Sequence, residues 1–251
     1  MNDHGRINSC RWWLDGTVNL GECIQWISED TLEVQLGEPI AKTTLSSVEK
    51  ISDWIRSVKP GWLIDHCYGF GVLSLTVRPE LVTTSLVLDE LNGVLNRATS
   101  EFSDVDSKFI EIPVCYAPEF GLDLQSISET TQLSLPEIID LHSGREYLVL
   151  ATGFVPGFAY LGETDGRIHL PRRDTPRTRI PAGSVAIAEN QTVVYPRETP
   201  GGWHIIGRMP GSIVSSTKNS IDAKLTMGSL VRFKPISLNE FKIIEESHAS
   251  D

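Results

Sequence analysis

Arginines gather in one stretch of this chain, where their chemistry could bind an anion. Between Arg167 and Arg208 there are seven arginines, no lysine and three acidic residues, although the whole chain has a net charge of -11. A guanidinium group binds carboxylate or phosphate through two parallel hydrogen bonds. Prolines and the Gly201–Gly202 pair hold the backbone of this stretch in fixed, non-helical paths. The pattern indicates either a preformed anion site or a set of β-turns tied by arginines to backbone carbonyls.

Four of these arginines are the candidate catalytic residues. Residues two apart in an extended segment share a face, so Arg177 and Arg179 are predicted to point together and to hold one anionic group. The complete set is Arg172, Arg177, Arg179 and Arg208.

A second group of residues would line the binding site. Pro156–Gly157 reverses the chain after the apolar run 147–152, which would place the rings of Phe158 and Tyr160 beside a pocket or inside the end of a barrel. Glycine lets backbone N–H groups approach a ligand closely. The candidates for binding substrate or nucleotide are Pro156, Gly157, Phe158, Tyr160, Thr175, Ser184, Gly201 and Gly202. His169 and His204 are the only histidines in this stretch, and a lone histidine is more often structural than a base.

The spacing of these residues resembles a known family. G-F-x-P-G-F-x-Y-L-G begins at Gly153, P-R-x-x-T-P-R-T-x-x-P-A-G-S-V-x-I-A begins at Pro171, and Q-T-x-x-Y-P-x-E-x-P-G-G-W-x-x-I-G-R begins at Gln191. This is the pattern of the KipI / allophanate hydrolase subunit 1 family. Glu119–Asp123 fits a further loop of the same family, whereas the first 100 residues match it only in outline.

The resemblance implies an activity, a cofactor and partners. The branch that the chain most resembles is the ATP-dependent 5-oxoprolinase, which converts 5-oxoproline to glutamate and in which this chain would be the B subunit. Its partners would be a homologous second barrel subunit of the PxpC/KipA type and a LamB/YcsF-like A subunit. ATP, with Mg, would be bound in the complex, and the arginines would counter the charge of the γ-phosphoryl group or hold the substrate carboxylate. We therefore expect Arg177→Ala to leave folding intact and to lower the activity of the assembled enzyme by at least roughly tenfold.

Several catalytic devices are absent from the sequence. There is no G-x-x-x-x-G-K-[ST] phosphate loop, no G-x-S-x-G nucleophile turn and no H-E-x-x-H or clustered Cys/His metal motif. We therefore expect no metal site in the protein itself, and an enzyme subunit that does not work alone as an ATP-hydrolysing cyclic amidase. Two alternatives stay open: a KipI-like inhibitor of a histidine kinase, and half of a urea-carboxylase-type carboxyltransferase.

Hydrophobic periodicity predicts two domains, an α+β N-terminal domain of ferredoxin-like order followed by a mainly-β domain, which the resemblance implies to be a cyclophilin-like barrel. The first, 1–100, has predicted strands at 31–36, 62–65 and 72–77 and helices at 44–58 and 81–98. A polar linker covers 99–108. The second, 109–240, has predicted strands at 109–115, 147–152, 184–188, 192–195, 203–206 and 230–233, and one or two helices in 124–143 capped by Ser134 and Glu137. A polar tail is predicted at 241–251.

Composition narrows the classes of function. The acidic balance argues against binding nucleic acid or an anionic membrane, because neutralising phosphate needs a broad basic face. No signal-peptide-like stretch and no apolar run of about 20 residues is present. The four cysteines form no C-x-x-C pair, so free thiols and a cytoplasmic location are expected.

Overall fold

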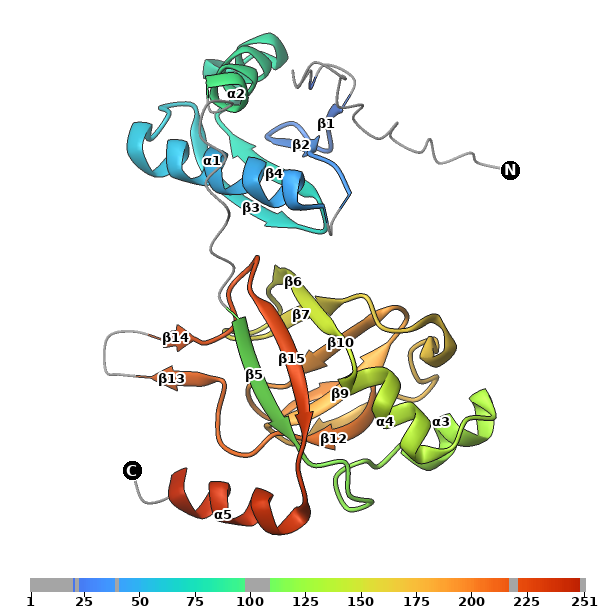
Figure 1. Ribbon diagram of the computed structural model, residues 1–251. Helices are drawn as coiled ribbons and strands as arrows, with labels where there is room; N and C mark the ends of the chain where they lie inside the picture. The colour runs from blue at the N-terminus through green and yellow to red at the C-terminus, as the bar shows by residue number, and fades with distance from the viewer. Residues whose placement is uncertain (1–19, 21–22, 39–40, 98–108, 217–220, 249–251) are drawn as a thin grey trace. The chain divides into compact units, whose positions relative to one another are not determined.

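The computed structural model describes residues 20, 23–38, 41–97, 109–216 and 221–248. The chain forms two compact units, Met1–Asp106 and Ser107–Asp251 (Figure 1). The predicted linker lies outside the described residues.

The first unit is an antiparallel sheet with two helices. Its strands lie in the order β1-β2-β4-β3, and every neighbouring pair is antiparallel. The elements are β1 Ile24–Trp26, β2 Thr31–Gln35, α1 Lys42–Val58, β3 Leu63–Gly69, β4 Val72–Val77, the short helix η1 Pro79–Leu81 and α2 Thr84–Arg97. The five predicted elements are all present in the predicted order. The structure adds β1 beside β2 and extends β3 to Gly69, past the predicted end of that strand at residue 65.

The apolar residues that predicted these elements form the core of the first unit. Every second residue of β4 is buried, and α1 buries side chains three or four residues apart. The buried residues include Leu32, Val34, Leu45, Val48, Ile51, Leu73, Leu75, Val77, Leu91 and Leu95. α1 ends before Lys59, whose left-handed backbone (φ 50°) precedes the helix-breaking Pro60.

Cys67 is a free thiol, whereas Cys23 is disulfide-bonded, so the expectation of free thiols is wrong at Cys23.

The second unit is built on a large, mainly antiparallel sheet (Figure 1). Neighbouring strands run β6-β7-β10-β9-β12, and β15 joins β6 to β5, with β5 and β15 parallel. The strands are β5 Phe109–Val114, β6 Glu146–Thr152, β7 Ala159–Gly162, β8 Arg177–Ile180, β9 Ser184–Ala188, β10 Gln191–Val194, β11 Thr199–Gly201, β12 His204–Arg208, β13 Val214–Ser216, β14 Ile221–Ala223 and β15 Leu230–Pro235. The helices are α3 Leu124–Thr131, η2 Gly166–Ile168, α4 Leu135–Ser143 and α5 Leu238–His248. All six strands predicted for this part of the chain are present, and no end is shifted by more than two residues.

The two ends of this sheet meet. Cys115, just after β5, forms an antiparallel bridge with Arg208 at the end of β12, and the two N···O distances are 2.8 and 2.9 Å. A Cβ atom on Gly207 would lie 2.8 Å from Cγ1 of Val114 and 3.0 Å from the carbonyl oxygen of Cys115. Only glycine allows β12 to approach β5 this closely.

Both faces of the central strands are buried, which explains the continuous apolar run of β9. Val185 and Ile187 belong to the main core, whereas Ala186 and Ala188 pack into a second cluster on the opposite face. The main core contains Ile127 of α3 and Ile138 of α4, so these helices cover one face of the sheet. The other face carries the aromatic residues of the predicted site.

The predicted capping box starts α4. The backbone N–H of Ser134 donates to Oε2 of Glu137 (2.8 Å), and the backbone N–H of Glu137 donates to Oγ of Ser134 (3.4 Å). Such a cap contributes about 1 kcal/mol to helix stability. The prediction of one or two helices in 124–143 is confirmed with two helices, α3 and α4.

A buried histidine fixes α4 to the sheet. Nε2 of His142 lies 2.8 Å from Oγ1 of Thr192, which donates to the carbonyl oxygen of Ala186, so this nitrogen carries the proton. Nδ1 then accepts from the hydroxyl of Tyr116 at 2.8 Å. Complete burial lowers the pKa of His142 to about 3, so the ring stays neutral at physiological pH.

The predicted polar tail differs in the structure, because most of it belongs to α5. Ser237 and Glu240 cap this helix reciprocally. The ring of Phe241 packs 4.5 Å from that of Phe120, and Glu245 accepts from the backbone N–H of Gly211. None of the helices in the described ranges has the length and apolar character needed to cross a membrane.

Candidate functional site

The loop between β6 and β7 carries the first predicted site residues. It reverses the chain as predicted, since β6 and β7 are antiparallel neighbours. Its backbone is left-handed at Phe154 (φ 74°) and at Gly157 (φ 82°). A Cβ atom on Gly157 would lie 2.1 Å from Cγ2 of Val214, so both space and conformation demand glycine. Pro156 is exposed, and Phe154 exposes 64% of its surface.

Four aromatic rings, which we call the aromatic face, follow this loop on the sheet: Phe158, Tyr160, Tyr195 and Trp203. Ring centroids lie 5.0 Å apart for Phe158 and Tyr160, and 5.3 Å apart for Phe158 and Tyr195. Tyr160 and Trp203 are 6.2 Å apart. Phe158, Tyr195 and Trp203 are buried, and burial raises the pKa of Tyr195 to about 12. Tyr160 is half-buried, so of the two rings predicted to wall a pocket it is the one that reaches the surface.

A buried carboxylate organises the arginine segment. Asp123, at the start of α3, is 3% exposed and accepts four hydrogen bonds. Arg177 donates two of them, both at 2.8 Å, Arg173 donates one at 2.6 Å, and the backbone N–H of Ile205 donates one at 2.7 Å. Burial alone would raise the pKa of Asp123, but the hydrogen bonds and the two positive charges hold it below its usual value.

The predicted convergence of Arg177 and Arg179 is wrong. Arg177 converges with Arg173 on Asp123, whereas Arg179 forms an exposed ion pair with Glu198 at 2.8 Å. The two side chains diverge because the pairing of β8 with β11 is irregular, with a register shift between Thr199 and Gly201. Removing Arg177 would therefore also cost stability, contrary to the expectation that folding stays intact.

Two of the four candidate arginines keep an unneutralised charge. The guanidinium carbon of Arg172 lies 5.8 Å from the ring centre of Trp203. That of Arg208 lies 5.7 Å from the ring centre of Phe120, and its Nε donates to the carbonyl oxygen of Ala182 at 3.1 Å. Within the described part of the chain neither arginine has an acidic partner. Among the four candidates, Arg172 and Arg208 are therefore the arginines whose charge can meet an external anion.

The structure shows what surrounds the glycine pair and two other predicted binding residues, Ser184 and Thr175. A Cβ atom on Gly201 would lie 2.4 Å from the hydroxyl oxygen of Tyr195. The carbonyl oxygen of Gly202 accepts from the backbone N–H of Arg173 at 2.8 Å. Ser184 is buried next to Arg208, with which it pairs across β9 and β12, and Thr175 is exposed. Their roles in binding stay predictions.

The two histidines of the segment each contact a backbone carbonyl. Nε2 of His169 lies 3.1 Å from the oxygen of Thr164, and Nε2 of His204 lies 2.9 Å from the oxygen of Pro171. Across the residues that the structure describes, no group of three or more His, Cys, Asp or Glu side chains could hold a metal ion.

Sequence reasoning missed the roles of Asp123, Arg173 and Trp203. Asp123 stands in the Glu119–Asp123 match, which marked the position but gave it no function. Its partners lie 50 to 82 residues away along the chain, so no local pattern could connect them.

Comparisons with known proteins show which family and which relatives the chain resembles. Residues 23–221 match the family described as "Carboxyltransferase domain, subdomain C and D". A Bacillus subtilis (strain 168) protein named as the B subunit of 5-oxoprolinase is 44% identical over 147 residues, which cover 59% of this chain and 61% of that protein. The Escherichia coli O157:H7 protein of the same name is 35% identical over 211 residues, covering 83% and 94%. The crystal structure of the Kluyveromyces lactis urea carboxylase superposes with a TM-score of 0.69 over 90% of this chain and 22% of that one, at 15% identity, so this likeness concerns the fold alone.

Proposed function

The chain belongs to the family of the carboxyltransferase domain, subdomain C and D, and we propose that within this family it is the B subunit of an ATP-dependent 5-oxoprolinase. In this function it acts with a second barrel subunit of the PxpC/KipA type and a LamB/YcsF-like A subunit to convert 5-oxoproline to glutamate. The observation that carries the proposal is the identity of 35% and 44% to two proteins that bear the name of the 5-oxoprolinase B subunit.

The surroundings of Arg172 and Arg208 support an anionic ligand. Arg172 and Arg208 carry positive charge without an acidic partner in the described residues, and Arg172 lies over Trp203. A nucleotide phosphate or the carboxylate of 5-oxoproline would match these guanidinium groups. ATP therefore fits the residues present, and Arg172, with Tyr160 and Trp203 near it, is the group that we assign to hold it. Mg would accompany the phosphates.

ATP would supply the phosphoryl group that turns the lactam oxygen into a leaving group. One water would add to the carbon, and the C–N bond of the lactam would break as the nitrogen takes a proton, which leaves an acyl phosphate. A second water would hydrolyse this acyl phosphate to glutamate and phosphate. In this chemistry Arg172 and Arg208 neutralise the charge that develops on phosphate or hold the substrate carboxylate. The ion pairs of Asp123 with Arg173 and Arg177 position the arginine segment without contacting substrate.

We also propose a fold type for each of the two units. The bridge between Cys115 and Arg208 supports a cyclophilin-like β-barrel for the second unit. The order β2-β4-β3, with α1 and α2 between and after the strands, supports a ferredoxin-like first unit in which β1 stands where a strand after α2 would lie.

The two alternative functions have less support. The urea-carboxylase likeness concerns the fold alone, and no contact among the described residues points to a kinase partner. A carboxyltransferase would use biotin, and its activity would depend on a biotinylated protein rather than on 5-oxoproline.

Reconstitution tests the proposed function. The purified chain alone should not form glutamate, whereas mixing it with its two partner subunits should give glutamate and ADP that depend on both ATP and 5-oxoproline. Omitting each subunit in turn is the control. Turnover by this chain alone, or none in the complete mixture, would reject the proposal.

A further inference from the structure

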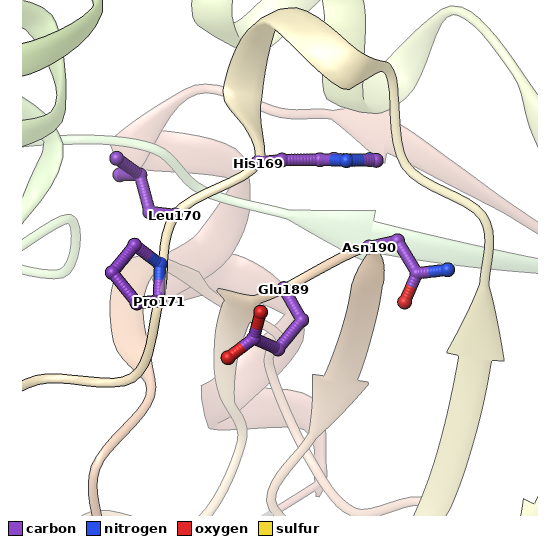
Figure 2. A pocket seen from close by; sticks show the side chains of 5 residues that line it. All are labelled: His169, Leu170, Pro171, Glu189 and Asn190. Atoms are coloured by element: carbon purple, nitrogen blue, oxygen red, sulfur yellow. The ribbon is translucent and has the colours of Figure 1, made fainter. Parts of the chain in front are cut away.

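A hollow of about 320 Å³ lies at the turn between β9 and β10. The pairing of β7 with β10 places Gln191 opposite Gly162 and Val194 opposite Ala159, so this turn lies at the other end of the strands from the Phe154–Gly157 loop. The hollow is lined by His169, Leu170, Pro171, Glu189 and Asn190. Figure 2 shows the ring of His169 edge-on across the hollow from Glu189, with Leu170 and Pro171 on one side and Asn190 on the other.

A strained turn holds the Glu189 carboxylate in this hollow. Ala188 pairs with Gln191, so Glu189 and Asn190 form a two-residue hairpin loop. Glu189 has φ 52°, a conformation for which such loops usually select glycine. Its backbone N–H donates to the carbonyl oxygen of Leu170 at 2.6 Å, but among the described residues its carboxylate has no partner. Glu189 is exposed, so water solvates this carboxylate, and an unfavourable backbone that presents it beside the hollow points to a binding role.

Each of the other two polar side chains of the hollow, His169 and Asn190, offers an acceptor. Nε2 of His169 must carry its proton to bond the carbonyl oxygen of Thr164, which leaves Nδ1 as an acceptor. Nδ2 of Asn190 uses one of its two N–H groups to donate to Oε1 of Glu163 at 3.0 Å, and Oδ1 of Asn190 is an acceptor. A carboxylate, an imidazole nitrogen, an amide oxygen and the flat face of a ring therefore surround the space. The ligand that suits them is cationic, planar and rich in donors.

We propose that this hollow binds a guanidinium group. A guanidinium has five N–H donors and no acceptor, it pairs with a carboxylate through two parallel bonds, and it stacks on ring faces. Glu189 receives the two bonds, His169 supplies the stacking face, and Leu170 and Pro171 cover an attached methylene chain. The ammonium of lysine can pair with Glu189 but cannot stack. Arg172 is not the occupant, because its guanidinium lies over Trp203.

The polar residues that line the hollow differ from the residues assigned to the proposed function. His169 precedes the signature segment that begins at Pro171, and Glu189 and Asn190 fall between two signature segments, so none of the three stands at a fixed position of the family pattern. The guanidinium comes either from an arginine side chain of a partner protein or from a free guanidino compound. Because a binding measurement tests this site, its failure is distinct from a failure of 5-oxoprolinase activity.

Calorimetric titration of the full chain tests the proposal with three probes: agmatine, N-acetyl-arginine amide and N-acetyl-lysine amide. Both guanidinium probes should bind, and the lysine probe at least about tenfold more weakly. Glu189→Gln should weaken guanidinium binding at least about tenfold, whereas Glu80→Gln, the same change at an exposed glutamate of the first unit, should not. His169→Ala should weaken binding and His169→Phe should restore it, since phenylalanine returns the ring face.

The probes also separate the two sources of the ligand. Tighter binding of the arginine amide than of agmatine assigns the hollow to a protein side chain, and the reverse order assigns it to a free compound. Equal affinity for arginine and lysine probes, full binding by a folded Glu189→Gln variant, or no binding of either guanidinium probe would overturn the proposal. Circular dichroism of each variant shows that it is folded.

Discussion

Replacing Asp123 by asparagine should destabilise the second unit by about 3 kcal/mol, because it leaves two guanidinium groups without their anion. Asparagine has nearly the same shape, so its Oδ1 can still accept from the backbone N–H of Ile205. The same oxygen can keep the bond from Nη1 of Arg177, but the amide nitrogen then faces Nη2 of Arg177 and Nη1 of Arg173, where no bond can form. The change therefore removes charge pairing while it leaves the packing almost unchanged.

The magnitude follows from burial. Removing one partner of a fully buried ion pair costs about 3–5 kcal/mol. The Asp123 side chain is 4% exposed, but those of Arg177 and Arg173 are 24% and 29% exposed, so water reaches them and lowers the cost. We therefore expect the lower part of that range. Because the ion pairs hold the pKa of Asp123 below its usual value, their contribution is present at neutral pH and is lost as the pH falls through the folded pKa.

Urea unfolding followed by circular dichroism measures this effect. With a slope of about 2 kcal/mol per molar urea, the midpoint should fall by about 1–2 M. Asp174→Asn is the matched control, because Asp174 is exposed in the same segment and has no partner in the described residues. Coincident midpoints for the wild-type protein and Asp123→Asn would show that the network does not stabilise the fold, and the reasoning would be wrong.

Three further predictions concern separate features. Arg172→Ala should lower the ATP-dependent activity of the assembled enzyme about tenfold without changing its melting temperature, because its charge has no acidic partner among the described residues. In the wild-type protein the pKa of His142 is about 3 when folded and 6.5 when unfolded, so protonation favours the unfolded chain and the free energy of unfolding falls by about 1.4 kcal/mol per pH unit below pH 6.5. His142→Gln should remove this part of the pH dependence. Urea midpoints at pH 7 and pH 5 measure this. Gly157→Ala should destabilise the protein by about 1–3 kcal/mol through its left-handed backbone and its clash with Val214, as thermal melting would show.

Matched controls accompany these variants. Arg197→Ala changes an exposed arginine without a partner among the described residues, and activity should be retained. Gly61→Ala places a Cβ atom where no atom lies within 4 Å, so the melting temperature should stay the same. Loss of activity in Arg197→Ala equal to that in Arg172→Ala, or equal melting of the Gly157 and Gly61 variants, would contradict the assignments. An unchanged pH dependence in His142→Gln would show that His142 does not titrate on unfolding.

Local order made much of the fold predictable. The alternation in β4 and the three- and four-residue spacing in α1 reflect burial against a single core, which sequence periodicity records directly. The cap of α4 uses residues three apart, Ser134 and Glu137, and is therefore readable. Ser237 and Glu240 form the same serine–glutamate pair three residues apart, and this pair could have predicted α5 in place of a polar tail.

The candidate site was less predictable, because its contacts join distant segments. The sequence shows that Arg177 can bind an anion, but only the fold shows that Asp123, 54 residues away, is the anion in this structure. The strand pattern placed Arg177 and Arg179 on one face, yet long side chains beside an irregular strand pair reach different acids. Unpaired charge, which distinguishes Arg172 from Arg179, is a property of the folded chain alone.

At Arg208 the backbone closes the large sheet, whereas the side chain is free for a different role. The bridge with Cys115 uses only backbone N–H and C=O groups, so any residue able to adopt an extended conformation can complete it. The side chain at 208 can therefore be exchanged by evolution or by a protein engineer, to suit a different ligand charge, while the seam of the sheet is kept. Gly207 lacks this freedom, since its missing Cβ lets the strands meet. Gly207 is thus required for the shape of the sheet, whereas the side chain at position 208 can change to give a new ligand specificity.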